Sequence, residues 1–212
     1  DEAGQFEDWI ELYNDGTSSV VVFVAVDVTQ RKEAEKTIRH MAYHDDLTGL
    51  PNRSLLVDRA EMVLGHARRH QEPASLIFVD VDNLKCINDT LGHGLADEVL
   101  KTLAKRLVGA FRDGDTIARF GGDEFVILLP YTNAEAAGRA AQKILDLGRE
   151  KLTILGEEIE PKMSVGVSVY PRDGDNLDRL LAGADAAMYA AKRGGRDQFR
   201  FFSAREPESV PE

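Results

Sequence analysis

A pair of acidic residues, Asp123 and Glu124, stands where a strongly apolar segment begins. The pair leads into the apolar run 125–129 and follows two glycines, Gly121 and Gly122. A Gly-Gly pair between two β-prone runs is typical of a tight hairpin, because both glycines tolerate a positive φ. Carboxylates at the start of a buried strand are costly unless they hold a cation. Taken alone, however, the stretch is more typical of an acidic turn in solvent.

Another carboxylate stands at the end of a second apolar segment. Asp80 follows the run 75–79, whose continuous apolar character is that of a strand buried on both faces. Capping of the next helix accounts in part for Asn83, but it does not account for Asp80. If this strand lies beside the hairpin, Asp80 faces Asp123. The clustered oxygens then form a hard site suited to Mg²⁺ or Mn²⁺ together with substrate phosphates.

The composition limits the partners that such a site can have. The 212 residues carry a formal net charge of −11, which argues against nucleic acid or an anionic membrane as a partner. A phosphate-bearing ligand therefore needs a local cluster of basic residues or metal ions. The single cysteine excludes an internal disulfide, and no apolar run approaches the ~20 residues of a membrane span. We expect a cytoplasmic fragment, and the missing initial Met leaves a membrane anchor before Asp1 open.

The elements that must position these residues alternate along the chain. Helices are predicted at about 29–43, 54–67, 84–93, 96–111, 133–147 and 176–193. Strands are predicted at about 9–13, 20–28, 75–79, 116–118, 125–129, within 151–170 and at 198–202. Because antiparallel hairpins interrupt the alternation, we expect an α+β fold with a central, mostly antiparallel sheet of about five strands flanked by helices.

The two ends of the chain are predicted to lie outside this fold. Two β-prone runs joined by a turn at Asn14–Thr17 predict a hairpin, and a helix with a thin apolar seam follows. Residues 1–30 resemble the C-terminal end of a PAS sensor domain, and residues 31–45 resemble its output helix. The tail 203–212 is polar and is expected to be flexible.

Several motifs in order make residues 46–202 resemble the GGDEF domain of the diguanylate cyclase family. They are residues 46–53, 78–93 with Asp97, 119–125, 164–168 and 184–196. The resemblance implies a fold like the palm of nucleotide polymerases and adenylyl cyclases. It also implies that two GTP molecules are condensed into cyclic di-GMP with release of two pyrophosphates. A homodimer is implied as well, since each subunit holds one GTP.

The resemblance gives the acidic residues defined roles. Asp80, the backbone carbonyl of Val81 and Asp123 would hold two Mg²⁺ or Mn²⁺ ions per active site. Asp123 would also accept the proton of the GTP 3′-hydroxyl, with support from Glu124. Two ions about 3.5–4 Å apart are suited to clamp the attacking and leaving oxygens of an in-line displacement.

Three kinds of contact with GTP are implied by the same matches. The guanine edge is read by an amide and a carboxylate, Asn88 and Asp97. The triphosphate is neutralised by three cations, Lys85, Lys192 and Arg196. Capping of a helix C-terminus is the alternative interpretation of the last two cations. Gly121 and Gly122 leave room for a base or a phosphate beside the backbone.

An inhibitory product site is implied just before the signature, at Arg112 and Asp115. A guanidinium pairs well with guanine or phosphate, although a surface ion pair is the alternative interpretation. One departure from the family is Ala96, which replaces a glycine and is expected to narrow the nucleotide pocket. The alternative function is a catalytically weak module that binds GTP or cyclic di-GMP and regulates an adjacent domain, for example an EAL phosphodiesterase.

Overall fold

Two compact units make up the chain, Asp1–Ala42 and Tyr43–Glu212. The computed structural model describes residues 6–14, 19–91, 93–154 and 156–203. The predicted turn at 14–17 lies largely outside these residues, and the predicted flexible tail lies outside them except for its first residue.

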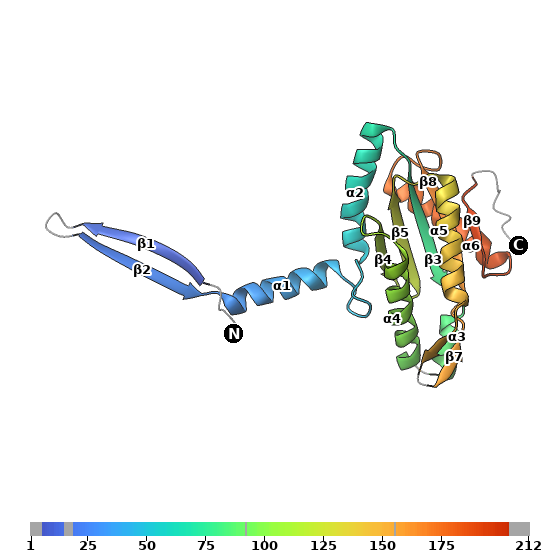
Figure 1. Ribbon diagram of the computed structural model, residues 1–212, viewed down its shortest axis with the longest axis horizontal. Coiled ribbons are helices and arrows are strands. Elements are labelled where there is room, and N and C mark those ends of the chain that lie inside the picture. Colours follow the sequence, from blue (N-terminus) through green and yellow to red (C-terminus); the bar gives the residue numbers. More distant parts are fainter. Residues whose placement is uncertain (1–5, 15–18, 92, 155, 204–212) are drawn as a thin grey trace, which may run out of the picture. The chain divides into compact units, whose positions relative to one another are not determined.

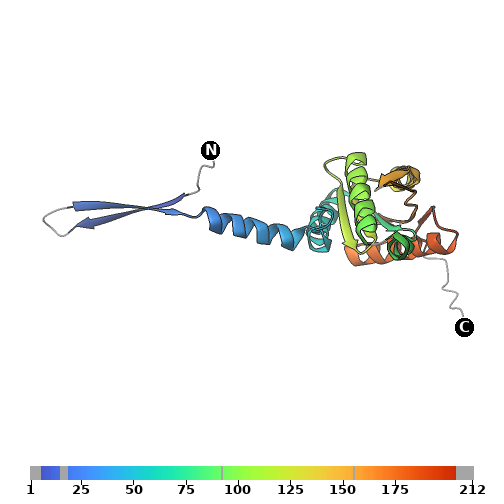
Figure 2. The same ribbon diagram turned by 90° about the horizontal axis from the view of Figure 1, so that it is seen from below.

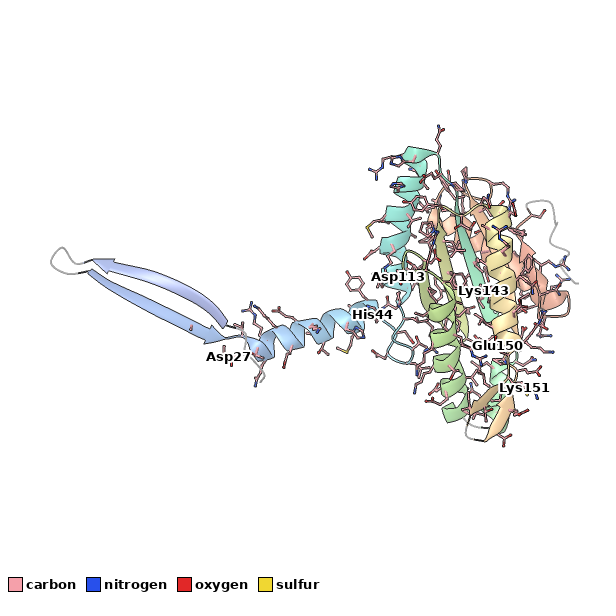
Figure 3. All side chains as sticks on the ribbon, viewed as in Figure 1. Asp27, His44, Asp113, Lys143, Glu150 and Lys151 are labelled. Atoms are coloured by element: carbon pink, nitrogen blue, oxygen red, sulfur yellow. The ribbon has the colours of Figure 1, made fainter. Side chains whose placement is uncertain are left out.

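The first unit is a hairpin followed by a helix, as predicted. Strand β1 (Phe6–Asn14) pairs antiparallel with β2 (Ser19–Asp27), and helix α1 spans Thr29–Tyr43. The Asp27 carboxylate accepts the N–H of Thr29 at 2.9 Å, which fixes the start of the helix. Figure 3 labels Asp27 at this junction.

The second unit contains the predicted five-stranded sheet. Its strand order is β4-β5-β3-β8-β9, with three antiparallel contacts and one parallel contact between β8 and β9. The strands are β3 (Ala74–Val81), β4 (Thr116–Gly121), β5 (Glu124–Pro130), β8 (Met163–Tyr170) and β9 (Phe199–Phe201). A separate small hairpin is formed by β6 (Leu152–Ile154) and β7 (Glu157–Ile159). The α+β prediction is therefore confirmed.

Helices cover both faces of this sheet, as Figures 1 and 2 show. One core contains buried residues of α4 (His93–Ala110) and α5 (Ala134–Arg149), and the other contains those of α2 (Arg53–His70) and α6 (Leu177–Arg193). Alternate residues of β3 enter opposite cores: Ile77 and Val79 the first, Leu76 and Phe78 the second. Burial on both faces explains the unbroken apolar run of this strand. The short α3 (Leu84–Leu91) follows it.

Helix α6 lies directly on the backbone of β8 because a glycine stands beneath it. A Cβ atom at Gly166 would lie 1.9 Å from the carbonyl oxygen of Ala184 and 2.3 Å from the amide nitrogen of Met188. Beside this contact, the Ser168 hydroxyl donates to the carbonyl of Leu180 at 2.8 Å. This close contact determines the position of α6 over the sheet, and the C-terminal turn of α6 carries Lys192.

None of the described helices is long and apolar enough to cross a membrane.

Candidate active site

The acidic residues gather at the edge of the sheet where β3 ends and β5 begins. Asp80 is paired with Glu124 across the two strands, and the N–H of Val81 donates to the carbonyl of Asp123 at 3.1 Å. The expectation that Asp80 faces Asp123 is therefore wrong by one residue. Gly122, at φ 45°, and Asp123 form the turn itself, so the first strand position falls to Glu124.

Strand alternation directs both paired carboxylates toward α6. Val79 and Phe125 belong to the core under α4 and α5, so the neighbouring Asp80 and Glu124 lie on the opposite face. On that face the Nζ of Lys192 lies 2.6 Å from Oδ2 of Asp80. The sequence-predicted Asp80, Asp123, Glu124 and Lys192 are thus brought to one edge of the sheet.

Burial and like charges make this edge electrostatically costly. Burial, together with the nearby charges of Asp123 and Asp82, raises the pKa of Asp80 to about 6 against the opposing effect of Lys192. Burial and the charges of Asp123 and Asp185 likewise raise the pKa of Glu124. Each carboxylate would therefore be stabilised by a further cation at this edge.

The donor chemistry of the edge fits a hard divalent cation. Carboxylates and a backbone carbonyl are the oxygen ligands that Mg²⁺ and Mn²⁺ prefer. Among the described residues, however, no three His, Cys, Asp or Glu side chains are already arranged as a metal site. The ammonium group of Lys192 instead lies against Asp80, only 6% of whose side chain is exposed.

A second buried carboxylate holds the turn that carries Arg196. Oδ1 of Asp82 accepts the Ser164 hydroxyl at 2.8 Å, and Oδ2 accepts the N–H of Asp197 at 3.2 Å. The Nε of Arg196 lies 3.8 Å from the same carboxylate. The structure therefore brings Arg196 to the same edge as Lys192. Asp82 thus has a set of partners that the sequence analysis did not predict.

The turn at the signature is held by an arginine that the sequence did not single out. Arg119 donates from Nε and Nη2 to the carbonyl of Gly122 at 3.0 and 2.7 Å. Its Nη1 donates to both carboxylate oxygens of Asp45 at 3.0 Å. Burial opposes ionisation of Asp45, but hydrogen bonds from Thr48 and Arg119 outweigh it and lower the pKa of this carboxyl. An ion pair thus ties the segment before α2 to the acidic turn.

The residues predicted to contact GTP away from the carboxylates lie on α3 and α4. Lys85 and Asp97 are exposed and Asn88 is half-buried. Within the part of the chain that is described, no hydrogen bond or ion pair joins these three to Asp80 or Glu124. Gly122 has open space where a side chain would stand, and at Gly121 the nearest atom is 3.9 Å away. These two glycines leave the room that the sequence predicted.

Ala96 lies in the core, and its expected effect on the nucleotide pocket stays a prediction. The residue is 2% exposed and packs in the core beneath α4 with Val99 and Leu100. Its methyl group therefore lies in the interior of the protein, whereas the adjacent Asp97 is exposed.

Arg112 and Asp115 form an ion pair, as the alternative interpretation expects, and the inhibitory product site stays a prediction. The Nε of Arg112 lies 3.0 Å from Oδ1 of Asp115, and its Nη2 donates to the carbonyl of Pro130 at 2.7 Å. Figure 3 labels the intervening Asp113 in the loop between α4 and β4. A cavity of about 270 Å³ adjoins this loop, with a lining of Met62, Val63, His66, Ala67, Gly114, Pro130 and Tyr131.

Several known proteins are similar to this chain in sequence. Residues 42–198 match the family model described as "Diguanylate cyclase, GGDEF domain". The chain is 38% identical to the bifunctional diguanylate cyclase/cyclic di-GMP phosphodiesterase MucR of Pseudomonas aeruginosa over 180 residues. The aligned residues cover 85% of this chain and 26% of MucR. It is 36% identical to the diguanylate cyclase TpbB of the same organism, over 85% of this chain and 42% of TpbB. The chain thus spans less than half of either relative.

Solved structures agree with these matches. The GGDEF domain of TpbB superimposes with a TM-score of 0.74 at 38% identity, covering 76% of this chain and 95% of that one. The GGDEF domain of DgcB from Caulobacter crescentus, solved in complex with c-di-GMP, gives a TM-score of 0.71 at 27% identity, covering 77% and 94%. The family match covers four of the five sheet strands, β4, β5, β3 and β8, together with the acidic edge, and it ends just before β9. The chain therefore belongs to the GGDEF family of diguanylate cyclase domains.

Proposed function

We propose that the second unit condenses two GTP molecules into cyclic di-GMP and releases two pyrophosphates. The observation that carries this proposal is the acidic edge, where Asp80 and Glu124 are paired, Asp123 forms the turn, and Lys192 and Arg196 lie close by. Membership in the diguanylate cyclase family supports the same reaction.

In this reaction the 3′-oxygen of one GTP attacks the α-phosphorus of the other. A bond forms between that oxygen and the phosphorus, the bond to the β-phosphate oxygen breaks, and pyrophosphate leaves with the bonding electrons. The hydroxyl proton passes to Asp123, and Glu124, whose pKa is raised, supports the transfer. Repeating the step with the roles exchanged closes the cyclic product.

The other residues bind and orient the nucleotide. Lys192, Arg196 and the exposed Lys85 neutralise the triphosphate, which a chain of net charge −11 can do only locally. Asn88 and Asp97 pair with the acceptor and N–H groups of guanine. When bound, Mg²⁺ or Mn²⁺ held by Asp80, the Val81 carbonyl and Asp123 would stabilise charge on the phosphate oxygens.

The reaction requires two copies of the chain. Each active site holds one GTP, and the two must meet face to face for the second bond to form. Helix α1 exposes Ile38 and Met41 by 62% and 54%, and such an apolar seam is stabilised by a partner helix. We assign residues 1–30 to the end of a PAS-like sensor and α1 to the connection that carries its signal.

Product inhibition is proposed at Arg112 and Asp115. Arg112 donates to the carbonyl of Pro130, and Pro130 and Gly114 line the 270 Å³ cavity. A guanidinium held by a carboxylate is suited to bind guanine or phosphate of cyclic di-GMP.

A regulatory role without turnover is the second candidate. MucR is bifunctional, and this chain spans only 26% of it. A GGDEF module beside a phosphodiesterase can act by binding GTP or cyclic di-GMP alone. The ion pair between Lys192 and Asp80 would then be the resting state of the site.

The two candidates are separated by incubating the protein with GTP and Mg²⁺ or Mn²⁺ at increasing protein concentration. Turnover per chain is expected to rise with concentration as dimers form, with cyclic di-GMP and pyrophosphate in a ratio of one to two. Binding of GTP without any cyclic di-GMP at high protein concentration would rule out the first candidate and favour the second.

A further inference from the structure

The turn that follows α6 has an unusual backbone. Arg196 and Asp197 adopt φ values of 63° and 47°, so two consecutive residues with side chains occupy the left-handed region. Such conformations are sparsely populated and persist only where the surroundings hold them. Gly195, at φ 115°, begins the reversal, and the N–H of Arg196 donates to the carbonyl of Ala191 at 3.1 Å.

Asp197 is held in this turn from two sides. From the turn that follows β3, Asp82 accepts its backbone N–H at 3.2 Å. From the end of α5, the Nε of Arg149 donates to both side-chain oxygens at 3.0 and 3.2 Å, and its Nη2 donates to the backbone carbonyl at 3.0 Å. The backbone N–H, backbone carbonyl and carboxylate of one residue are therefore all engaged, immediately after Arg196.

The end of α5 is itself fixed, so that Arg149 has a rigid support. The guanidinium of Arg106, on α4, donates to the carbonyls of Leu147, Glu150 and Lys151 at 3.1, 3.0 and 3.2 Å. Figure 3 labels Glu150 and Lys151 at this end of α5, beside the small hairpin. The end of α5 cannot shift without breaking these hydrogen bonds. The position of Arg149 relative to Asp197 is therefore fixed.

We infer that Arg149 is a positioning residue that acts through Asp197 to hold Arg196 ready for the triphosphate of GTP. The inference rests on the proposed function, which assigns Arg196 to that triphosphate. The ionic partners of Arg149 in the described part of the chain are Asp146 and Asp197, so its influence reaches the acidic edge through the turn. Within the same part of the chain, no residue accepts a hydrogen bond from the terminal nitrogens of Arg196, whose side chain is 53% exposed.

Preorganisation of this kind affects binding rather than the chemical step. If the turn relaxes, Arg196 must be ordered again when GTP binds, and the cost appears in the affinity. We expect Arg149→Gln to raise KM for GTP about tenfold, the effect of one charge-assisted contact, with kcat within about twofold of the wild type.

The test compares three single variants on an otherwise intact chain. Arg149→Gln removes the charge and the fork, and Arg149→Lys keeps the charge but loses the two-pronged geometry, so an intermediate KM is expected. Arg139→Gln is the matched control, since Arg139 lies on the same helix in an exposed pair with Glu135 at 2.6 Å. Circular dichroism establishes that each variant is folded.

Two further readouts separate positioning from a general structural role. In an Arg196→Ala background, Arg149→Gln is expected to add nothing to KM, because its effect passes through Arg196. The affinity for GTP, but not for guanosine, is expected to fall in Arg149→Gln. Additive effects on KM, or equal losses for GTP and guanosine, would overturn the inference.

GTP binding also distinguishes this inference from the proposed function. If the wild type binds GTP but makes no cyclic di-GMP, the proposed reaction fails, and the GTP-specific loss in Arg149→Gln still supports positioning. If the wild type makes cyclic di-GMP and Arg149→Gln matches it in KM, the positioning inference fails by itself. A wild-type chain that does not bind GTP contradicts both.

Discussion

Replacing Gly166 by alanine tests whether the close contact between α6 and β8 positions the active site. The added Cβ would lie 1.9 Å from the carbonyl oxygen of Ala184 and 2.3 Å from the backbone nitrogen of Met188. Both are backbone atoms in the middle of a helix, so neither can rotate away as a side chain would. The whole of α6 must therefore move away from the sheet.

The size of this movement follows from the contact distance. Ordinary van der Waals contact begins near 3.4 Å, so α6 must retreat by about 1.5 Å. Overpacking of this kind typically costs 1–3 kcal/mol, and we expect about 3 kcal/mol because backbone atoms are involved. The same movement would break the 2.6 Å contact between Lys192 and Asp80. Misplacement by about 1 Å can reduce a rate on the order of a hundredfold, and we expect a loss of that order.

The assay combines urea unfolding with the rate of cyclic di-GMP formation. Far-ultraviolet circular dichroism is the suitable probe, since the single tryptophan, Trp9, lies in β1 of the first unit. Gly65→Ala is the matched control, because Gly65 is within α2 and nothing lies within 4 Å of the added Cβ. This control is expected to gain up to about 1 kcal/mol and keep its rate. Gly166→Ala with wild-type stability and rate would refute the role given to the contact.

Three other perturbations have defined outcomes. Asp45→Asn is expected to cost about 1–3 kcal/mol at pH 7 by breaking the pair with Arg119, whose side chain is 13% exposed. An unperturbed Asp has a pKa of about 3.9, and the fold lowers the pKa of Asp45. The stabilisation by the Asp45–Arg119 pair is therefore complete above about pH 3.9 and is lost as the pH falls through the pKa of Asp45 in the folded protein. Urea unfolding at pH 7 and pH 3 should thus show the wild-type advantage shrinking in acid, and a constant difference would contradict it. Arg112→Ala should weaken binding of cyclic di-GMP at least about tenfold by calorimetry, whereas unchanged binding would remove Arg112 from the product site. Chelation of divalent ions by EDTA should abolish product formation and excess Mg²⁺ should restore it; turnover that persists in EDTA would exclude the proposed metal requirement.

The fold was predictable where a local sequence pattern is compatible with only one kind of structural element. The apolar run 75–79 predicted a central strand, and β3 is indeed buried on both faces. Gly121–Gly122 predicted a hairpin, which β4 and β5 form. The strand register was not predictable to one residue, because a Gly-Gly pair does not determine which residues occupy the turn. Asp123 occupies it, and Glu124 is therefore the partner of Asp80.

The sequence predicted which acidic and basic residues gather at the acidic edge, but not the residues that support them. Asp80, Asp123, Lys192 and Arg196 lie in motifs, and the structure places them at one edge. Arg149 and Asp197 are far apart in sequence and lie in ordinary polar surroundings, so nothing in the sequence pairs them. The burial of Ala96 was not predicted either. Comparison with the glycine that the family has at this position does not indicate the direction in which the methyl group points.

The most direct test of the central claim is the detection of cyclic di-GMP by mass spectrometry after incubation with GTP and Mg²⁺. The wild type is compared with Asp80→Asn and Asp123→Asn, each verified as folded by circular dichroism. We predict cyclic di-GMP from the wild type and none above background from either variant, because both carboxylates are needed at the acidic edge. Equal product from Asp123→Asn and the wild type would contradict the account.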